Sequence, residues 1–410
     1  MIDLGAVRDD QNLVQRLKLK DPNFPIEQLL ALDEQRKTLT ASTEQLRARK
    51  NELAKSAQSG ITQEIRAESI TLGEQIKKQE QELETVTQEF KSLYLHCPNI
   101  PDAVLPVGGK EANQVINVFG KKPVFDFEPL NHIALNKKLG WFDLEAAARM
   151  SGSGFVLYRG DAVKLIYALT HLMLRNNHKN GFELLLPPYV INEKALETAS
   201  NFPRFKQDVY AIKDEDLYLT PTAEVNLTNM YRDTILTAEQ LPVRMTSWTS
   251  CFRREAGGYG AQERGLIRIH EFEKVELYSL VKPEDSMQEL ENMRTCAESI
   301  LQQLGLHYRV SLLATQDCSF PSAKTYDLEV WMPGQQAYYE VSSCSNCTDF
   351  QARRASMRFR RSATAKPELV HTLNASSLAL PRLMVALMET YQQKDGSIAL
   401  PAALTTYMDW

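Results

Sequence analysis

The chain contains a long stretch in which apolar residues recur with heptad spacing. Between Ile26 and about Leu95, Gln, Glu, Lys, Arg and Leu dominate, and no proline follows Pro25. Two segments, separated at Gln58-Ser59-Gly60, carry the apolar positions: Leu32, Leu39, Leu46 and Leu53 in the first; Ile65, Leu72, Val86 and Leu93, with Ile76, Leu83 and Phe90, in the second. The pattern predicts two long helices paired as an antiparallel coiled coil. With a rise of 1.5 Å per residue, an arm of about 30 residues projects roughly 45 Å.

Basic side chains stand on the first of these helices, although the protein as a whole is acidic. They are Arg36, Lys37, Arg47, Arg49, Lys50 and Lys55. A charge run is usually a solvated face. The arm is therefore either a structural or dimerising hairpin, or a surface for RNA.

After Pro98 the patterning changes to that of a mixed domain. Residues 98–120 hold several Pro and Gly residues and are interpreted as a linker. Strand-like segments follow at 184–191, 217–220, 247–255, 267–278, 325–332 and 338–343, with helical segments at 161–176, 283–304 and 381–391. Strands outnumber regular strand–helix–strand units, which predicts an α+β domain with a large antiparallel sheet flanked by helices. We expect an N-terminal domain over residues 1–110 and a second domain over 111–410.

Two strand-like segments joined by a glycine-rich loop carry the densest chemistry. The first is Phe252-Arg253-Arg254-Glu255-Ala256-Gly257-Gly258, and the second runs from Arg268 to Glu276. With a period of two, Arg253 and Glu255 share one face, and Phe272, Lys274 and Glu276 share another. Paired, the segments present a cation, carboxylates and an aromatic ring, which suits a nucleotide and a small zwitterion.

Composition narrows the class of protein. The chain has 410 residues, 43% hydrophobic and 24% charged, as in ordinary globular proteins. No run of about 18 apolar residues could span a bilayer, the N-terminus has no signal-peptide pattern, and six cysteines do not indicate a disulfide framework. We expect a reducing cytoplasm and no membrane partner. A net charge of −5 argues against wholesale, non-specific nucleic-acid binding.

Other motifs add candidate ligands. The chain has neither a P-loop nor a Gly-x-Gly-x-x-Gly fingerprint. Thr222 and Glu224, interpreted as sharing a face after a strand, could meet an ammonium group, and Glu340 could bind Mg²⁺. Cys344 and Cys347 lack the further ligands that zinc needs, so no zinc is expected. Arg382 falls in the first turn of a helix, where it opposes the dipole, which favours a role facing a ligand. His270 and His371 are interpreted as hydrogen-bonding residues.

Taken in order, the motifs resemble those of bacterial-type seryl-tRNA synthetases, a class II family. The resemblance covers nearly the whole chain and includes Phe125-Asp126-Phe127-Glu128-Pro129, Thr220-Pro221-Thr222-Ala223-Glu224, residues 252–276 and Lys324-Thr325-Tyr326-Asp327-Leu328-Glu329. The chain departs from the family at Ala375, Ser377 and Pro381, where glycine is common, and at Arg254, often serine.

The resemblance implies ATP-dependent ligation of L-serine to serine tRNA through seryl-adenylate, and use of selenocysteine tRNA in many organisms. It implies a homodimer with Pro187-Pro188 near the interface, and an arm that grips the long variable arm of tRNA across the dimer. A non-catalytic tRNA-binding paralogue, an enzyme that loads a carrier protein, and a class II ligase for threonine, proline or glycine are the weaker alternatives.

The family's residue roles carry over onto matching positions. Serine would contact Thr222, Ala223, Glu224, Arg253, Glu276 and Ser376. ATP would contact Arg253, Arg254, Glu255, Ile269, Phe272, Glu340, Val341, Ser342, Ser343 and Arg382, with Phe272 and Arg382 on the two faces of adenine. Mg²⁺ would be held by Glu340 and Ser343. Arg253, Arg382 and Glu340 are the expected catalytic residues. Arg36, Arg47, Arg49 and Lys50 are the expected contacts to tRNA.

Overall fold

The computed structural model describes residues 1–56, 62–256 and 264–408. The predicted turn at Gln58-Ser59-Gly60 and the glycines Gly257-Gly258 lie outside these residues. The chain divides into two compact units, Met1–Pro98 and Asn99–Trp410.

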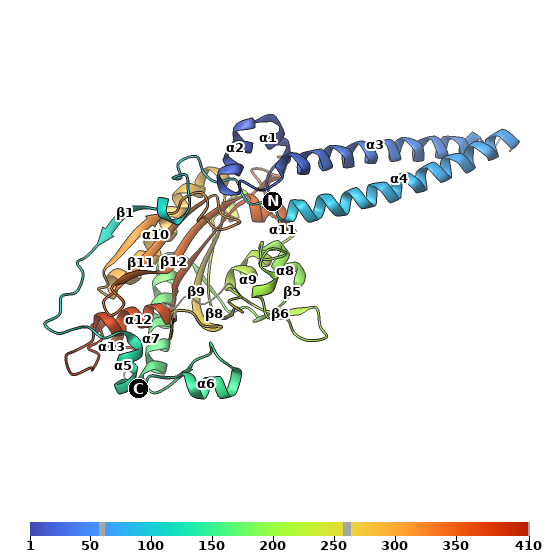
Figure 1. Ribbon diagram of the computed structural model, residues 1–410. Coiled ribbons are helices and arrows are strands. Elements are labelled where there is room, and N and C mark those ends of the chain that lie inside the picture. The colour runs from blue at the N-terminus through green and yellow to red at the C-terminus, as the bar shows by residue number, and fades with distance from the viewer. Residues whose placement is uncertain (57–61, 257–263, 409–410) are drawn as a thin grey trace. The chain divides into compact units, whose positions relative to one another are not determined.

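The first unit is helical. It consists of α1 (Leu4–Asp9), α2 (Gln11–Lys20), α3 (Ile26–Ser56) and α4 (Gln63–Leu95), and α3 and α4 lie side by side as a long hairpin (Figure 1). The heptad positions face the partner helix: Leu32, Leu53, Leu72, Ile76 and Val86 are buried. The predicted coiled-coil arm is confirmed.

The second unit contains nine helices and fifteen strands among its described residues. The helices are α5 (His132–Leu139), α6 (Leu144–Ser151), α7 (Asp161–Lys179), α8 (Glu193–Thr198), α9 (Ala223–Met230), α10 (Ser286–Gln303), α11 (Phe350–Ala355), α12 (Leu380–Thr390) and α13 (Ala402–Thr405). The strands are β1 (Gln114–Phe119), β2 (Phe142–Asp143), β3 (Leu157–Tyr158), β4 (Glu183–Leu185), β5 (Val190–Asn192), β6 (Leu217–Leu219), β7 (Ile235–Thr237), β8 (Val243–Phe252), β9 (Glu271–Val281), β10 (Tyr308–Leu312), β11 (Lys324–Met332), β12 (Ala337–Thr348), β13 (Arg358–Arg360), β14 (Glu368–Leu369) and β15 (His371–Ala379).

Eight of these strands form the main sheet, in the order β1-β10-β11-β12-β15-β9-β8-β4. Every neighbouring pair is antiparallel except β4 and β8. The predicted α+β fold with a large antiparallel sheet is confirmed.

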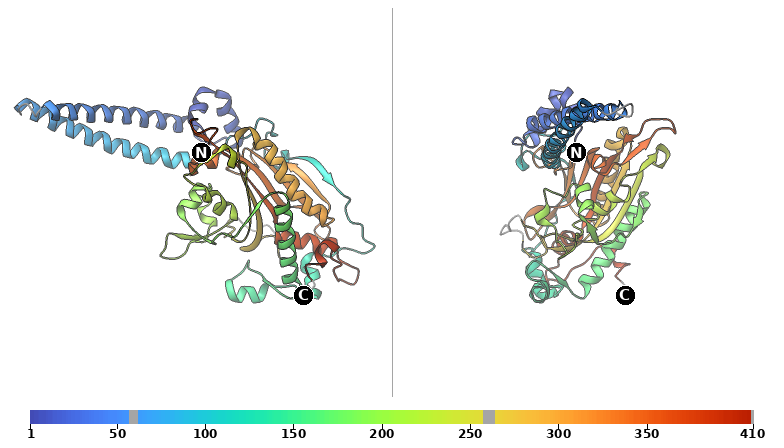
Figure 2. Two further views of the ribbon diagram at one scale, coloured as in Figure 1. Left: turned by 180° about the vertical axis from the view of Figure 1, so that it is seen from behind. Right: turned by 90° about the vertical axis from the view of Figure 1, so that its right-hand side faces the viewer.

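Alternation along β9 separates the two faces of this sheet. Val275, Leu277 and Val281 belong to the main core, which α7, α10 and α12 cover (Figure 2). Tyr278 and Leu280 point to the other face, where they pack with residues of α9 and α11. Because side chains alternate with period two, Lys274 and Glu276 share this second face.

Two expectations about elements were wrong. Residues 184–191 form two short strands, β4 and β5, because Pro187-Pro188 lie between them and proline cannot donate to a ladder. The interpreted linker 98–120 contains β1, which pairs with β10 at the edge of the sheet. All six side chains of β1 are exposed, so its sequence does not show the alternation of apolar and polar residues that marks a half-buried strand.

Residues 99–110, which the sequence analysis placed with the first domain, belong to the second unit. The Asn99 side-chain amide donates to the carbonyls of Pro321 (2.8 Å) and Cys347 (2.9 Å). The backbone N–H of Asp102 donates to the carbonyl of Ala323 at 2.7 Å. Within the ranges that the structure describes, no helix is both long and apolar enough to cross a membrane.

Candidate active site

The hairpin formed by β8 and β9 opens where the charged motif begins. β8 ends at Phe252 and β9 starts at Glu271, so Arg253 and Glu255 lie beyond the strand rather than on one face of it. Glu255 has φ +50°, a left-handed conformation that a strand cannot contain. The Arg253 N–H still donates to the His270 carbonyl at 2.8 Å. After this hydrogen bond the chain leaves the sheet, so the Arg253 and Glu255 side chains approach the end of the sheet from a loop.

A pocket of about 340 Å³ lies at this end of the sheet. The predicted residues that line it are Glu224, Arg253, Glu255, Ile269, Phe272, Glu276, Glu340, Val341, Ser343, Ser376 and Arg382. They come from the start of α9, both segments of the hairpin, β12, β15 and the start of α12. The fold therefore brings together residues that are up to about 160 positions apart in sequence.

One end of the pocket combines cations with an aromatic face. The Arg253 guanidinium lies over the Phe272 ring, 5.2 Å from its centroid. Arg382, in the first turn of α12 as predicted, donates to the carbonyls of Ile267 (3.1 Å) and Glu340 (2.8 Å). Exposed π faces and fixed guanidinium groups suit a purine ring and a phosphate.

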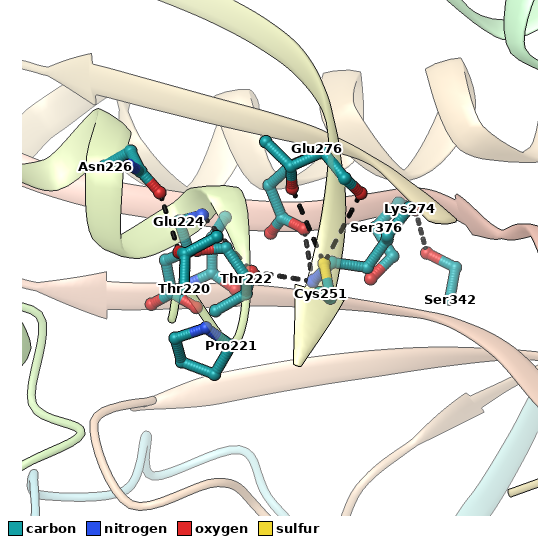
Figure 3. Close-up of polar contacts among 12 residues, drawn as sticks. Thr220, Pro221, Thr222, Glu224, Asn226, Cys251, Lys274, Glu276, Ser342 and Ser376 are labelled. Atoms are coloured by element: carbon teal, nitrogen blue, oxygen red, sulfur yellow. Dashed lines mark hydrogen bonds and ion pairs between the residues drawn. The ribbon is translucent and has the colours of Figure 1, made fainter. Parts of the chain in front are cut away.

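The opposite end of the pocket is acidic and buried. Thr222 caps α9 by accepting from the Glu224 N–H at 3.2 Å, so this segment starts a helix instead of following a strand on one face. The Glu224 carboxylate accepts from Gln351 (2.7 Å) and from Asn374 (3.2 Å). Figure 3 shows Thr222, Glu224 and Glu276 approaching one another from α9 and β9.

Burial perturbs both carboxyl groups at this end. It raises the pKa of Glu224 to about 7, with a further increase from the nearby Glu276 and an opposing effect of Lys274. Burial also raises the pKa of Glu276, against the attraction of Lys274 and Arg253. Two carboxyl groups with raised pKa values in a cleft are typical of a functional site, and they suit an incoming ammonium group.

The edge formed by β12 offers oxygen ligands. Glu340 and Ser343 both line the pocket, and Ser343 lies directly opposite Asp327 of β11. The Oδ1 atom of Asp327 is buried with no hydrogen-bond partner among the described residues. Carboxylate and hydroxyl oxygens fit Mg²⁺, which takes few protein ligands and completes its shell with phosphate and water. Among the described residues no group of three or more His, Cys, Asp or Glu side chains could hold a metal ion without such help.

Comparisons with known proteins agree with this geometry. Residues 1–101 match the Seryl-tRNA synthetase N-terminal domain, and residues 205–391 match the tRNA synthetase class II core domain (G, H, P, S and T). A serine–tRNA ligase of Akkermansia muciniphila is 44% identical, with 99% of this chain and 97% of the relative aligned. The chain belongs to the seryl-tRNA synthetase family. A second serine–tRNA ligase, from Syntrophobacter fumaroxidans, is 43% identical over 100% of this chain and 98% of its own.

A solved structure supports the assignment at the level of the fold. The seryl-tRNA synthetase from Pyrococcus horikoshii, complexed with ATP, superposes with a TM-score of 0.93. It is 33% identical and covers 100% of this chain and 98% of that one. Seryl-tRNA synthetases are aminoacyl-tRNA synthetases, so the chain is a member of an enzyme family of class II.

Some predicted residues of the seryl-tRNA synthetase site lie outside the pocket. Arg254 is exposed, and Ala223 and Ser342 are buried without lining it. The Ser342 hydroxyl donates to the Ser376 carbonyl at 2.5 Å. Thr222 lines an adjoining cavity of about 410 Å³, which also shares Glu224 and Arg253 with the pocket.

Four polar residues line the pocket but were not among the candidate ligands: Arg268, Lys274, Ser319 and Asn374. Arg268 binds the Glu255 carboxylate at 2.6 Å, Lys274 lies at the acidic end, and Asn374 holds Glu224. Period two from Phe272 and Glu276 already placed Lys274 on their face, and that signal could have identified it. The role of Asn374 depends on the position of β15 between β12 and β9, which the sequence does not indicate.

The remaining sequence candidates have structural partners. His270 Nδ1 lies 3.0 Å from the Arg253 carbonyl, and His371 Nδ1 lies 3.0 Å from the Ser286 hydroxyl. Cys344 and Cys347 are both buried, and neither forms a disulfide.

Most of the candidate tRNA contacts on the arm form ion pairs. The pairs are Arg36 with Asp33 at 3.0 Å, Arg47 with Glu80 at 2.6 Å and Arg49 with Glu68 at 3.1 Å. The Lys50 side chain is exposed. Exposed ion pairs contribute only about 0 to 1 kcal/mol, so a phosphate can displace the carboxylates of Glu80 and Glu68 at little cost.

Proposed function

We propose that this chain ligates L-serine to the 3′ end of serine tRNA in two steps. ATP and serine first form seryl-adenylate and pyrophosphate, and the seryl group then passes to tRNA. The observation that carries the proposal is one pocket with an arginine–aromatic end and a buried acidic end, in a chain whose full-length relatives are serine–tRNA ligases. The acidic end suits the serine ammonium, and the other end suits ATP.

Positioning and charge neutralisation account for the first step. The serine carboxylate is already a nucleophile, so it needs alignment with the α-phosphate rather than a general base. The Arg253 guanidinium lies over the Phe272 ring, and its charge also acts on Glu224 and Glu276, so it can neutralise charge that develops on an α-phosphate bound near it. Its side chain is oriented by donation to the Pro221 carbonyl at 3.2 Å.

The other residues fall into three groups by what they would bind. Phe272 and Arg382 would enclose adenine, with Glu255 and Ile269 at its edge. Thr222 and Glu224 would bind the serine ammonium, with Glu276 and Ser376 at its hydroxyl. Mg²⁺, held by Glu340 and Ser343, would neutralise phosphate charge. The buried oxygen of Asp327 beside Ser343 supports this cation site.

We also propose a homodimer with Pro187-Pro188 near the interface. Leu184 and Leu186 precede this segment, with 49% and 73% of their surface exposed. Leu184 lies on β4, the strand beside β8 at the edge of the main sheet, where apolar side chains and strand groups can be covered by a second copy. The arm would bind the long variable arm of serine tRNA across that dimer. Selenocysteine tRNA, which has a long arm too, would be a further substrate.

The test is ATP–pyrophosphate exchange measured with each of the twenty amino acids in the absence of tRNA. Exchange should not require tRNA, because every proposed ligand of the adenylate lies in the second unit. Serine should drive exchange better than any other amino acid. Faster exchange with another amino acid would refute the specificity, and no exchange with any would refute the activity.

A further inference from the structure

Lys274 is a buried lysine at the acidic end of the pocket. Its side chain is 7% exposed, and that of Glu276 is 2% exposed. The Lys274 ammonium donates to the Thr222 hydroxyl at 2.8 Å and forms an ion pair with Glu276 Oε2 at 2.5 Å. Figure 3 shows the end of Lys274 between these two side chains. A lysine almost never takes such a position without a charged partner.

The sheet holds this pair in place. Lys274 and Glu276 are two residues apart on β9, and therefore they point to the same side. Glu276 is opposite Ser247 of β8 and Ser376 of β15, so the three residues form a row across neighbouring strands, and Glu276 and Ser376 line the pocket. The Ser247 hydroxyl is buried and has no partner among the described residues.

The charged and titratable groups near Glu276 come from α9, from β8 and the segment after it, and from β9 itself. Glu224 approaches from α9, Arg253 from the segment after β8, and Cys251 from β8 itself, where burial raises the pKa of its thiol. Tyr278 on β9 has a pKa raised by burial as well. Lys274 is thus the cation in direct contact with Glu276, and its charge also opposes the raised pKa of Glu224.

We propose that Lys274 is a positioning residue for the hydroxyl of the substrate: bound to Thr222 and Glu276, it fixes the Glu276 carboxylate as a charged hydrogen-bond acceptor. The proposal rests on the proposed activation of serine. An ionised carboxylate only accepts hydrogen bonds, so its free lone pairs require a donor from the substrate. Serine supplies one, whereas alanine leaves a buried charge unsatisfied.

Without Lys274, Glu276 would take up a proton. A protonated carboxyl group can donate to a neighbour such as Ser247, and its demand for the substrate hydroxyl falls. Loss of the lysine should therefore weaken serine activation, reduce rejection of alanine, and move the pH dependence of serine use to higher pH.

The test compares Lys274→Met with wild type in ATP–pyrophosphate exchange between pH 6 and 9. We expect kcat/KM for serine to fall at least ~10-fold at pH 7, the scale for losing a charged hydrogen-bond partner. The ratio of kcat/KM for serine to kcat/KM for alanine should fall. The acidic limb, which is the part of the pH profile where kcat/KM for serine declines toward low pH, should move to higher pH. The KM for ATP should change less than about 2-fold, because the lost interaction concerns serine alone. In a Glu276→Gln background the same substitution should no longer change the serine-to-alanine ratio; a shift of the acidic limb that remains there belongs to Glu224, whose pKa Lys274 also lowers.

Lys194→Met is the matched control, because Lys194 is exposed on α8 and pairs only at the surface with Glu197 at 2.8 Å. If Lys274→Met does not fold by circular dichroism, Lys274→Gln, which keeps a donor to Thr222, carries the same test.

Two outcomes would overturn the role of Lys274 while leaving the proposed function intact. In one, Lys274→Met activates serine as fast as the wild type and has an unchanged or lower KM for serine, because the lysine would then merely obstruct the pocket. The other is a loss of rate with an unchanged pH limb and an unchanged serine-to-alanine ratio, because the lysine would then only support the fold. A wild-type protein that exchanges no serine would refute the proposed function itself.

Discussion

Binding of serine should release a proton from Glu224. In the empty pocket burial raises the pKa of this carboxyl group to about 7, well above its ordinary value of 4.5. An ammonium group placed beside it favours the charged form, so its pKa falls again on binding. A group that is half protonated at pH 7 then loses about 0.5 proton per serine bound; at pH 6 the loss is about 0.9, and at pH 8 about 0.1.

Isothermal titration of serine without ATP measures this number directly. The heat of binding is recorded at each pH in two buffers with different enthalpies of ionisation, and the difference gives the protons released. Over the same range the apparent Kd should fall about fivefold between pH 6 and pH 7 and about twofold between pH 7 and pH 8, and then level off.

Glu224→Gln is the matched control, because it preserves the shape of the side chain and cannot titrate. It should bind serine more weakly and release almost no proton at pH 6. Equal heats in both buffers at pH 6 for the wild type, or uptake of protons, would show that Glu224 is not the group that receives the ammonium.

Two further predictions concern the other end of the pocket and the arm. Arg253→Ala should lower adenylate formation at least ~10²-fold in pyrophosphate exchange, the scale for one preorganised transition-state group, with little change in Tm; a variant that keeps most of its activity would make Arg253 a surface residue. Deletion of residues 35–90 should leave exchange largely intact and sharply reduce tRNA serylation, since the pocket lies wholly in the second unit. Binding of tRNA should weaken steeply with salt, and replacing Arg47, Arg49 and Lys50 should flatten that dependence. Equal loss of exchange and serylation on deletion would mean that the arm supports the fold, and unchanged serylation would mean that it does not recognise tRNA.

The arm and the sheet could be predicted because their signals are local. A heptad repeat places one stripe of a helix against its partner whatever the rest of the chain does, and α3 and α4 follow it. The long central strands β9, β11 and β12 also carry enough apolar residues to be recognised. Short or exposed elements were not predicted. β1 has no buried face, and the start of α9 depends on the cap that Thr222 provides.

The residue types of the site were visible in the sequence, but their arrangement was not. Period two placed Phe272, Lys274 and Glu276 on one face, and the order of motifs identified the family. Only the tertiary structure showed that Lys274 lies between Thr222 and Glu276, and that Asn374 meets Glu224 across 150 positions of sequence. Charge pairing and raised pKa values come from burial by distant segments, and no local pattern encodes how deeply a side chain will be buried.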